Sequence, residues 1–317
     1  MISRRILRIK VMQALYAYYK NAGGASMNDI EKELHFSINK TYDLYHYMFL
    51  LIIDVCNYAQ KRIDIARNKK LPSEQDLRPN TKFIDNGLIA QLRMNSQLLR
   101  YTETKKLNWA NNPELIKGIY DEMSASDDYA EYMADLNQSY QSDKNFISKI
   151  YKNVIANYEP LYHALEEQSI FWNDEIEFVI GAVIKTIKKF KLPEAENAQL
   201  LSLYKNDEDK EFSKVLFRKT ILKRDEYQQL IEKFSKNWDF ERIAFVDILL
   251  IEMAIAEVLE FPSIPVKVTF NEYIELSKYY STNRSNIFIN GILDKIFAHL
   301  KETNQIKKQG RGLIGEE

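Results

Sequence analysis

The sequence is poor in the residues that form tight turns. Its 317 residues include 9 glycines and 7 prolines, together roughly 5% of the chain against a usual share of about 12%. Sandwiches, barrels and βαβ units need glycine in their short connections, so this shortage argues against them. Because 45% of the residues are hydrophobic and 28% are charged, the chain can still form a sizeable core. The composition predicts an all-α protein.

Two further shortages limit the chemistry. A single cysteine, Cys56, excludes an internal disulfide and a metal site built from several thiolates. The sequence has no G-x-x-x-x-G-K-[ST] and no H-E-x-x-H segment, and its four histidines are scattered. We therefore expect no catalytic residues, no metal and no cofactor, and a protein that is not an enzyme.

The chain has neither a large net charge nor a long uninterrupted hydrophobic segment. With 44 basic and 45 acidic residues, the formal net charge is -1, so any contact with nucleic acid must come from a local patch. The most apolar segment, 243–259, is interrupted by Asp247, Glu252 and Glu257 at five-residue steps, which argues against a membrane span. The start of the chain lacks the apolar run of a secretory signal. We expect a cytoplasmic protein with no membrane partner.

Apolar periodicity predicts a series of helices. The expected ranges are 3–20, 28–68, 82–108, 144–190, 211–236, 240–260, 266–281 and 285–301. Between Lys117 and Lys144 the chain has seven acids and no Lys or Arg, which is typical of a solvated segment. Residues 302–317 are polar and predict a flexible tail.

A weak internal repeat connects two parts of the chain. The separation from Phe146 to Trp172 equals that from Phe212 to Trp238. This register indicates two related helical modules in tandem. Helical sequences produce such coincidences readily, so coincidence stays open as the alternative.

The first helix carries a cluster of positive charge. Residues 1–20 contain no acid and five basic residues: Arg4, Arg5, Arg8, Lys10 and Lys20. Such a cluster attracts a phosphate backbone, and Tyr16 on the side opposite the apolar face can stack on an unpaired base. We place Arg4 and Arg8 at the border of this exposed side. The alternative is a solvated helix whose tyrosines pack against neighbours.

A second candidate lies in the segment STNRSNIFINGILDKI at 281–296. Asn283 and Arg284 form the tip of a polar turn, and Ser285 is placed to cap the following helix, whose N-terminus can meet phosphate. Gly291 is unfavourable inside this helix. A close contact with another helix at Gly291 is the predicted reason.

These segments resemble the NusB family of transcription antitermination proteins. RR-x-x-R-x-x-x-x-QALY at Arg4–Tyr16 resembles the family's opening helix, and NWDFERIAFVDILLIEMAIAEVL at 237–259 resembles its central helices. The segment at 264–296 resembles its closing signature of I-P-x-K-V, N-E, E-L-x-K and F-[VI]-N-G-[VI]-L-D. The matches occur in the expected order over about a third of the chain.

The resemblance implies a NusB-like helical bundle and an RNA-binding factor. Residues 1–20 and 211–301 would form the family-like module. Residues 21–210 would form a helical insertion whose role the sequence does not indicate, and residues 302–317 would form a flexible tail. The implied partners are boxA-containing RNA, ribosomal protein NusE and the RNA polymerase elongation complex, in ribosomal RNA operons. By position, the implied RNA-contacting residues are Arg4, Arg5, Arg8, Tyr16, Asn283, Arg284 and Ser285.

Two other functions stay open. A protein-interaction scaffold with lost RNA binding is favoured by the long insertion and by Ile6 and Ile9, which stand where family members often have basic or polar residues. An RNA-modifying enzyme is the weaker alternative. NusB-like domains precede methyltransferase domains elsewhere, whereas here the module lies at the C-terminal end.

Overall fold

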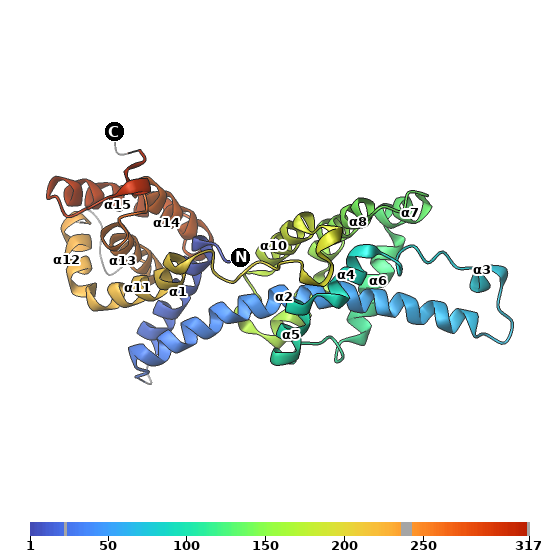
Figure 1. Ribbon diagram of the computed structural model, residues 1–317. Helices are drawn as coiled ribbons and strands as arrows, with labels where there is room; N and C mark the ends of the chain where they lie inside the picture. The colour runs from blue at the N-terminus through green and yellow to red at the C-terminus, as the bar shows by residue number, and fades with distance from the viewer. Residues whose placement is uncertain (22–23, 236–242, 316–317) are drawn as a thin grey trace. The chain divides into compact units, whose positions relative to one another are not determined.

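The structure is a computed structural model that describes residues 1–21, 24–235 and 243–315, without the side chains of 193–195 (Figure 1). Within these ranges the regular elements are α-helices and short 3-10 helices, and no strand occurs. The prediction of an all-α protein is confirmed. Trp238 and the rest of the segment 236–242 lie outside the described residues.

The helices form two compact units, and each is described by itself. Unit 1 contains Met1 and residues 39–203, whereas unit 2 contains residues 2–38 and 204–317. The long helix α2 (Met27–Arg67) contributes to both. The sequence predicts division near residues 20 and 210 instead. The first turns of α2 belong to unit 2, where Arg218 binds Glu31 and Asn28.

Unit 2 is arranged around one central helix. Its elements are α1 (Arg4–Lys20), the start of α2, α11 (Asp207–Leu222), α12 (Arg224–Phe234), α13 (Phe245–Glu260), α14 (Val266–Tyr280) and α15 (Ser285–Glu302). The central helix α13 packs against α1, α11, α12, α14 and α15 (Figure 1). Nearly all of its residues are buried as a result, which explains why its sequence is apolar on every side.

Three of the four carboxylates of α13, those of Asp247, Glu252 and Glu257, are buried rather than solvated. Five-residue steps turn a helix by about 140° each, so the three side chains point in three directions. Asp247 accepts hydrogen bonds from the loop before α15, Glu252 from α12, and Glu257 from α1 and α14. Each carboxylate therefore holds a different part of unit 2 against the central helix α13.

Unit 1 is a second helical bundle built on the rest of α2. Its elements are α3 (Glu74–Leu77), α4 (Gly87–Met94), α5 (Ser96–Lys105), α6 (Pro113–Ala125), α7 (Asp127–Ala134), α8 (Tyr140–Asn153), α9 (Glu159–Gln168) and α10 (Ile176–Lys189), with 3-10 turns η1 (Ile155–Asn157), η2 (Ile170–Trp172) and η3 (Leu192–Asn197). Trp109, Trp172 and Tyr151 are buried, and the polar tip of each donates a hydrogen bond to a carbonyl of α2. These bonds let polar aromatic side chains fill the core.

Three predicted ranges are broken, and the acidic segment is folded. The range 144–190 divides into α8, α9 and α10. The range 82–108 divides at Asn95, whose side chain accepts from the Leu98 amide at 2.9 Å and donates to the Ala198 carbonyl at 2.7 Å. The range 211–236 divides at Lys223 between α11 and α12. The acidic segment forms α6 and α7 and is not merely solvated, because its apolar residues, such as Met123, enter the core of unit 1.

The last part of the chain packs onto unit 2. Lys308 donates to the carbonyls of Val258 and Phe261 at the end of α13, at 2.9 and 3.0 Å. The Gln309 amide donates to the Pro262 carbonyl at 3.0 Å. These contacts differ from the predicted flexible tail. The segment GRGLIG at 310–315 matches G-x-G-x-x-G, but it forms the 3-10 turn η5 (Gly310–Leu313) without the strand and helix that a dinucleotide site requires.

Candidate nucleic-acid interface

The first candidate residues lie on α1. Ser3 caps the helix, accepting a hydrogen bond from the Ile6 amide at 3.3 Å. The buried side of α1 is wider than its sequence predicts, because Ile6, Ile9 and Met12 are also buried. The exposed residues are Arg5, Gln13, Tyr16, Ala17 and Lys20. The candidate surface of α1 is therefore a narrow stripe.

Arg8 is buried, and the prediction that it lies at the border of an exposed face is wrong. Its guanidinium forms a bidentate ion pair with Glu257, with both N–O distances at 2.7 Å. Burial alone would lower the pKa of Arg8, but the charge and hydrogen bonds of Glu257 more than offset this and raise it. The pair is completed by Thr269 and Tyr273, whose hydroxyls donate to Glu257. Arg8 connects α1, α13 and α14 and is removed from the candidate surface.

Arg4 and Arg5 are also paired with acids. Arg4 contacts Asp209 at 2.7 Å and Glu208 at 3.1 Å, and its side chain is largely covered. Arg5 binds Glu272 through two nitrogens, at 3.0 and 2.8 Å, with half of its side chain exposed. The sequence predicts arginines free for phosphate, whereas the structure provides Arg5 as the accessible one, with a counterion already in place.

Tyr16 lies at the other end of the exposed stripe, 46% exposed. Its ring contacts Phe245 edge to face, with centroids 5.7 Å apart. The ammonium of Lys20 lies 4.4 Å from the centre of the same Phe245 ring. Phe245 is the first residue of α13. An aromatic face and a positive charge are thus held together where the central helix begins.

The second candidate segment is organised by Asp247. Ser285 donates to one oxygen of this carboxylate at 2.8 Å and Ser281 to the other at 2.5 Å. Ser285 is 1% exposed, so its predicted place on the contact surface is wrong. It positions the loop instead, and its hydroxyl also accepts from the Thr282 amide at 3.1 Å.

Asn283 and Arg284 are the exposed tip of this loop. Arg284 is the residue that precedes the first turn of α15. In the part of the chain that the structure describes, its guanidinium forms no ion pair. Arg284 therefore differs from the arginines of α1, each of which is paired with an acid among the described residues.

Both candidate segments contact the first turn of α13, on sides of that helix about 200° apart. Phe245 contacts Tyr16 and Lys20 of α1, and two residues later Asp247 binds the loop at 281–285. Sequence reasoning included Lys20 in the basic cluster of the first helix but did not select Phe245 or Asp247 as parts of the site. The signal for Asp247 was its position as an acid in an apolar helix, since a buried carboxylate must find donors.

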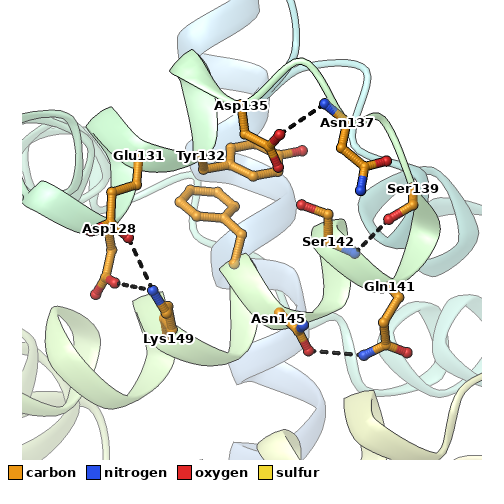
Figure 2. A pocket seen from close by; sticks show the side chains of 11 residues that line it. Asp128, Glu131, Tyr132, Asp135, Asn137, Ser139, Gln141, Ser142, Asn145 and Lys149 are labelled. Carbon is orange, nitrogen blue, oxygen red and sulfur yellow. Dashed lines mark hydrogen bonds and ion pairs between the residues drawn. The ribbon is translucent and has the colours of Figure 1, made fainter.

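A hollow of about 490 Å³ lies in unit 1 between α7 and α8 (Figure 2). Its floor is the stacked pair Tyr132 and Phe146, with ring centroids 4.0 Å apart. Lys149 binds Asp128 at 2.8 Å and Glu131 at 3.3 Å on one side (Figure 2). The acids hold α7 against α8, and their charge makes the hollow unfavourable for phosphate.

The described residues contain no candidate metal site and no candidate membrane span. No group of His, Cys, Asp and Glu there has the arrangement of a metal site. Among the described helices, none combines the length and apolarity needed to cross a bilayer.

Comparison with known proteins places the chain in a family. A sequence profile described as the NusB family matches residues 178–298. Over 112 residues the chain is 44% identical to the transcription antitermination protein NusB of Salinibacter ruber, covering 34% of this chain and 70% of that protein. The chain belongs to the NusB family. The resemblance to the NusB family seen in the sequence is thereby confirmed for a chain of 317 residues that includes a long insertion.

Other relatives match shorter parts. NusB of Chloroherpeton thalassium is 44% identical over 84 residues, which is 26% of this chain and 40% of that protein. NusB of Natranaerobius thermophilus is 43% identical over 88 residues, or 28% of this chain and 57% of that protein. No solved structure gives a significant match. All three relatives are named transcription antitermination proteins, so the chain is a member of a transcription antitermination family.

Proposed function

We propose that this protein is a non-enzymatic transcription antitermination factor that binds boxA-like single-stranded RNA together with ribosomal protein NusE. In this role it acts on the RNA polymerase elongation complex in ribosomal RNA operons, in the cytoplasm. The observation that carries the proposal is that the first turn of α13 holds both candidate segments: Phe245 contacts Tyr16 and Lys20, and Asp247 binds the ends of the loop at 281–285. Family membership supports the same role.

The proposed contacts divide into three kinds. The half-exposed ring of Tyr16 stacks on an unpaired base, which single-stranded RNA presents and a duplex does not. Lys20 and Arg284 bind phosphates, and Arg284 brings a planar set of donors that no acid of residues 1–21, 24–235 or 243–315 pairs with. Asn283 reaches a base edge with its amide. Ser285 acts through Asp247 by holding the loop in position.

The paired arginines limit the affinity. A phosphate that binds Arg5 must replace Glu272, and Arg4 and Arg8 are held by their own acids. The protein alone therefore binds RNA weakly. NusE strengthens binding because two joined surfaces raise the effective concentration of each contact.

The test exchanges Arg284 for Glu in the full chain and measures binding to boxA-containing and scrambled RNA, with and without NusE. We expect about a tenfold loss of affinity or more, and a weaker dependence on salt, because one phosphate contact is reversed in sign. Tyr16→Ala should weaken binding with little change in salt dependence, since stacking releases no counterions.

Lys267→Glu is the matched control. Lys267 is exposed at the opposite end of α14 from the loop, about 20 Å along the helix. Its exchange for Glu changes the net charge by the same amount as Arg284→Glu. Equal losses for Arg284→Glu and Lys267→Glu would show a general charge effect and no site at the loop. Unchanged binding in the Arg284 and Tyr16 variants would refute this RNA surface.

One observation favours the scaffold alternative. The three arginines of the family-like opening helix are all engaged by acids of unit 2, which is the arrangement expected if they maintain the fold. A pull-down of NusE in the presence and absence of RNA separates the two functions. Capture that does not depend on RNA, combined with no RNA binding by the complex, would favour the scaffold.

A further inference from the structure

A row of lysines lies at the end of α10 in unit 1. Lys185, Lys188, Lys189 and Lys191 are all exposed within seven residues. In the described part of the chain none of the four forms an ion pair. Exposed helix faces usually mix the two signs of charge, so a row of one sign needs an explanation.

The helix dipole does not provide that explanation. Basic residues near a helix C-terminus stabilise its free carbonyls. Here the buried Lys144 already donates to the carbonyls of Lys188 at 3.0 Å and Phe190 at 2.7 Å. The Gln91 amide donates to the carbonyl of Lys191 at 3.2 Å. The end of α10 is therefore satisfied from inside, and the exposed lysines add mutual repulsion.

A comparison within the chain explains why this face is open. A shift of 66 residues, the distance from Phe146 to Phe212, places α8, α9 and α10 on α11, α12 and α13 in order. The same shift places Lys185 and Lys189 on Ile251 and Ile255, which are fully buried. In unit 2 the helices α14 and α15 pack on α13. In unit 1 no further α-helix follows α10, and lysines occupy the uncovered positions.

We propose that this lysine face binds the phosphate backbone of single-stranded RNA as a second contact, independent of base sequence. The identity of the ligand as RNA rests on the proposed function; the site itself does not use the boxA-contacting residues. Lysines three and four apart lie side by side on a helix, and their flexible ammonium groups act as point charges without selecting bases. The lysines would displace the cations condensed on the RNA backbone, which makes the binding depend on salt.

The experiment compares the full-length parent with the triple variant K185Q/K188Q/K189Q. The probe is a labelled 30-nucleotide uridine homopolymer, which contains no boxA sequence, and binding is measured by fluorescence anisotropy over a range of KCl. Loss of three phosphate contacts should reduce the slope of log affinity against log salt by about 2. We expect at least about a tenfold loss of affinity at 0.1 M KCl.

The matched control is K105Q/K106Q/K117Q, which removes three exposed lysines from the same unit and changes the net charge equally. Its salt slope should equal that of the parent. Equal losses in the two triple variants, or no loss in the lysine-face variant, would overturn the proposal. Circular dichroism confirms that all variants are folded.

The two RNA proposals fail in different ways. If the lysine-face variant keeps homopolymer affinity while Arg284→Glu loses boxA binding, the second contact is wrong and the proposed function stands. If boxA and scrambled RNA bind alike and only the lysine-face variant loses affinity, the lysine contact stands and the boxA surface is wrong. A parent that binds no RNA contradicts both.

Discussion

Two arginines one turn apart on α1 have opposite environments. Arg8 is enclosed with Glu257, whereas Arg5 is half exposed beside Glu272. Removing one partner of an enclosed pair leaves an uncompensated charge, while an exposed pair contributes about 0–1 kcal/mol. An arginine in a basic cluster is thus available to RNA only when its counterion can be displaced, and this depends on residues more than 200 positions away.

Buried His46 makes the stability of the protein depend on pH. It stacks on Tyr101 and its Nδ1 lies 2.8 Å from the Tyr42 carbonyl. Burial lowers its pKa from 6.5 to about 4. The unfolded chain therefore binds a proton below pH 6.5 that the folded chain refuses. Stability is full above pH 6.5 and is lost by about 1.4 kcal/mol per pH unit as the pH falls toward 4.

The measurement is urea unfolding followed by tryptophan fluorescence at pH 7.0 and 5.5. His46→Phe keeps the stacked ring and removes the titration, so it should lose about 1 kcal/mol less than the parent between these two values. His163→Phe serves as the control, because His163 is an exposed residue of the same unit. An identical pH dependence in the parent and His46→Phe would show that His46 does not titrate as its burial requires.

At the scale of elements, the sequence predicts most helices but not where they break. Apolar periodicity is a local property, and it predicted α1, α2, α14 and α15 within a residue or two of the observed ends. The break at Asn95 depends on the Ala198 carbonyl about a hundred residues away, which no local pattern contains. Likewise, the predicted helix contact at Gly291 is not found, because an added Cβ there would lie within 4 Å of no atom of the described residues.

Gly291 and Gly312 differ in how closely other atoms approach them. Gly291 lies inside α15, and no atom in the described part of the chain lies within 4 Å of where its Cβ would be, so Gly291→Ala should stabilise the protein by up to about 1 kcal/mol. A Cβ on Gly312 would lie 1.9 Å from the Pro262 carbonyl oxygen. Gly312→Ala should therefore release residues 305–315 from the turn after α13.

Thermal unfolding checks the first change, and limited trypsin digestion checks the second. We expect a higher midpoint for Gly291→Ala, and faster cleavage after Lys308 and Arg311 only for Gly312→Ala. Each variant is the control for the other, since both make the same chemical substitution. Destabilisation by Gly291→Ala would indicate that a neighbour approaches this face after all. Unchanged cleavage in Gly312→Ala would mean that the tail is not held by the close contact at Pro262.

At the scale of the whole molecule, the chain combines a family-like unit with a second bundle. Apolar periodicity predicted the helices of unit 2, charge and turn chemistry selected both candidate segments, and the family signatures indicated the same two segments. They did not predict which arginines are enclosed, since Glu257 and Glu272 become partners only after folding. The boundary within α2 was also missed, because a continuous helix gives no sign that its first turns pack elsewhere.

The division into two units predicts separate unfolding. Arg8→Met leaves Glu257 buried without its partner, which should cost about 3–5 kcal/mol in unit 2 alone and lower its urea midpoint by about 1.5 M or more. In a Trp238→Phe background, the remaining tryptophans, Trp109 and Trp172, both belong to unit 1. Their fluorescence should keep the parent midpoint, while circular dichroism at 222 nm should show an added early transition.

Arg5→Met is the control, because it removes an exposed arginine from the same helix and should cost no more than about 1 kcal/mol. A common shift of fluorescence and circular dichroism in Arg8→Met would show that the two units unfold as one cooperative body. Separate transitions would mean that a variant can lose the fold of unit 2 while keeping unit 1. Loss of boxA binding, with the lysine face of α10 still binding the homopolymer, is the expected result in urea between the two midpoints.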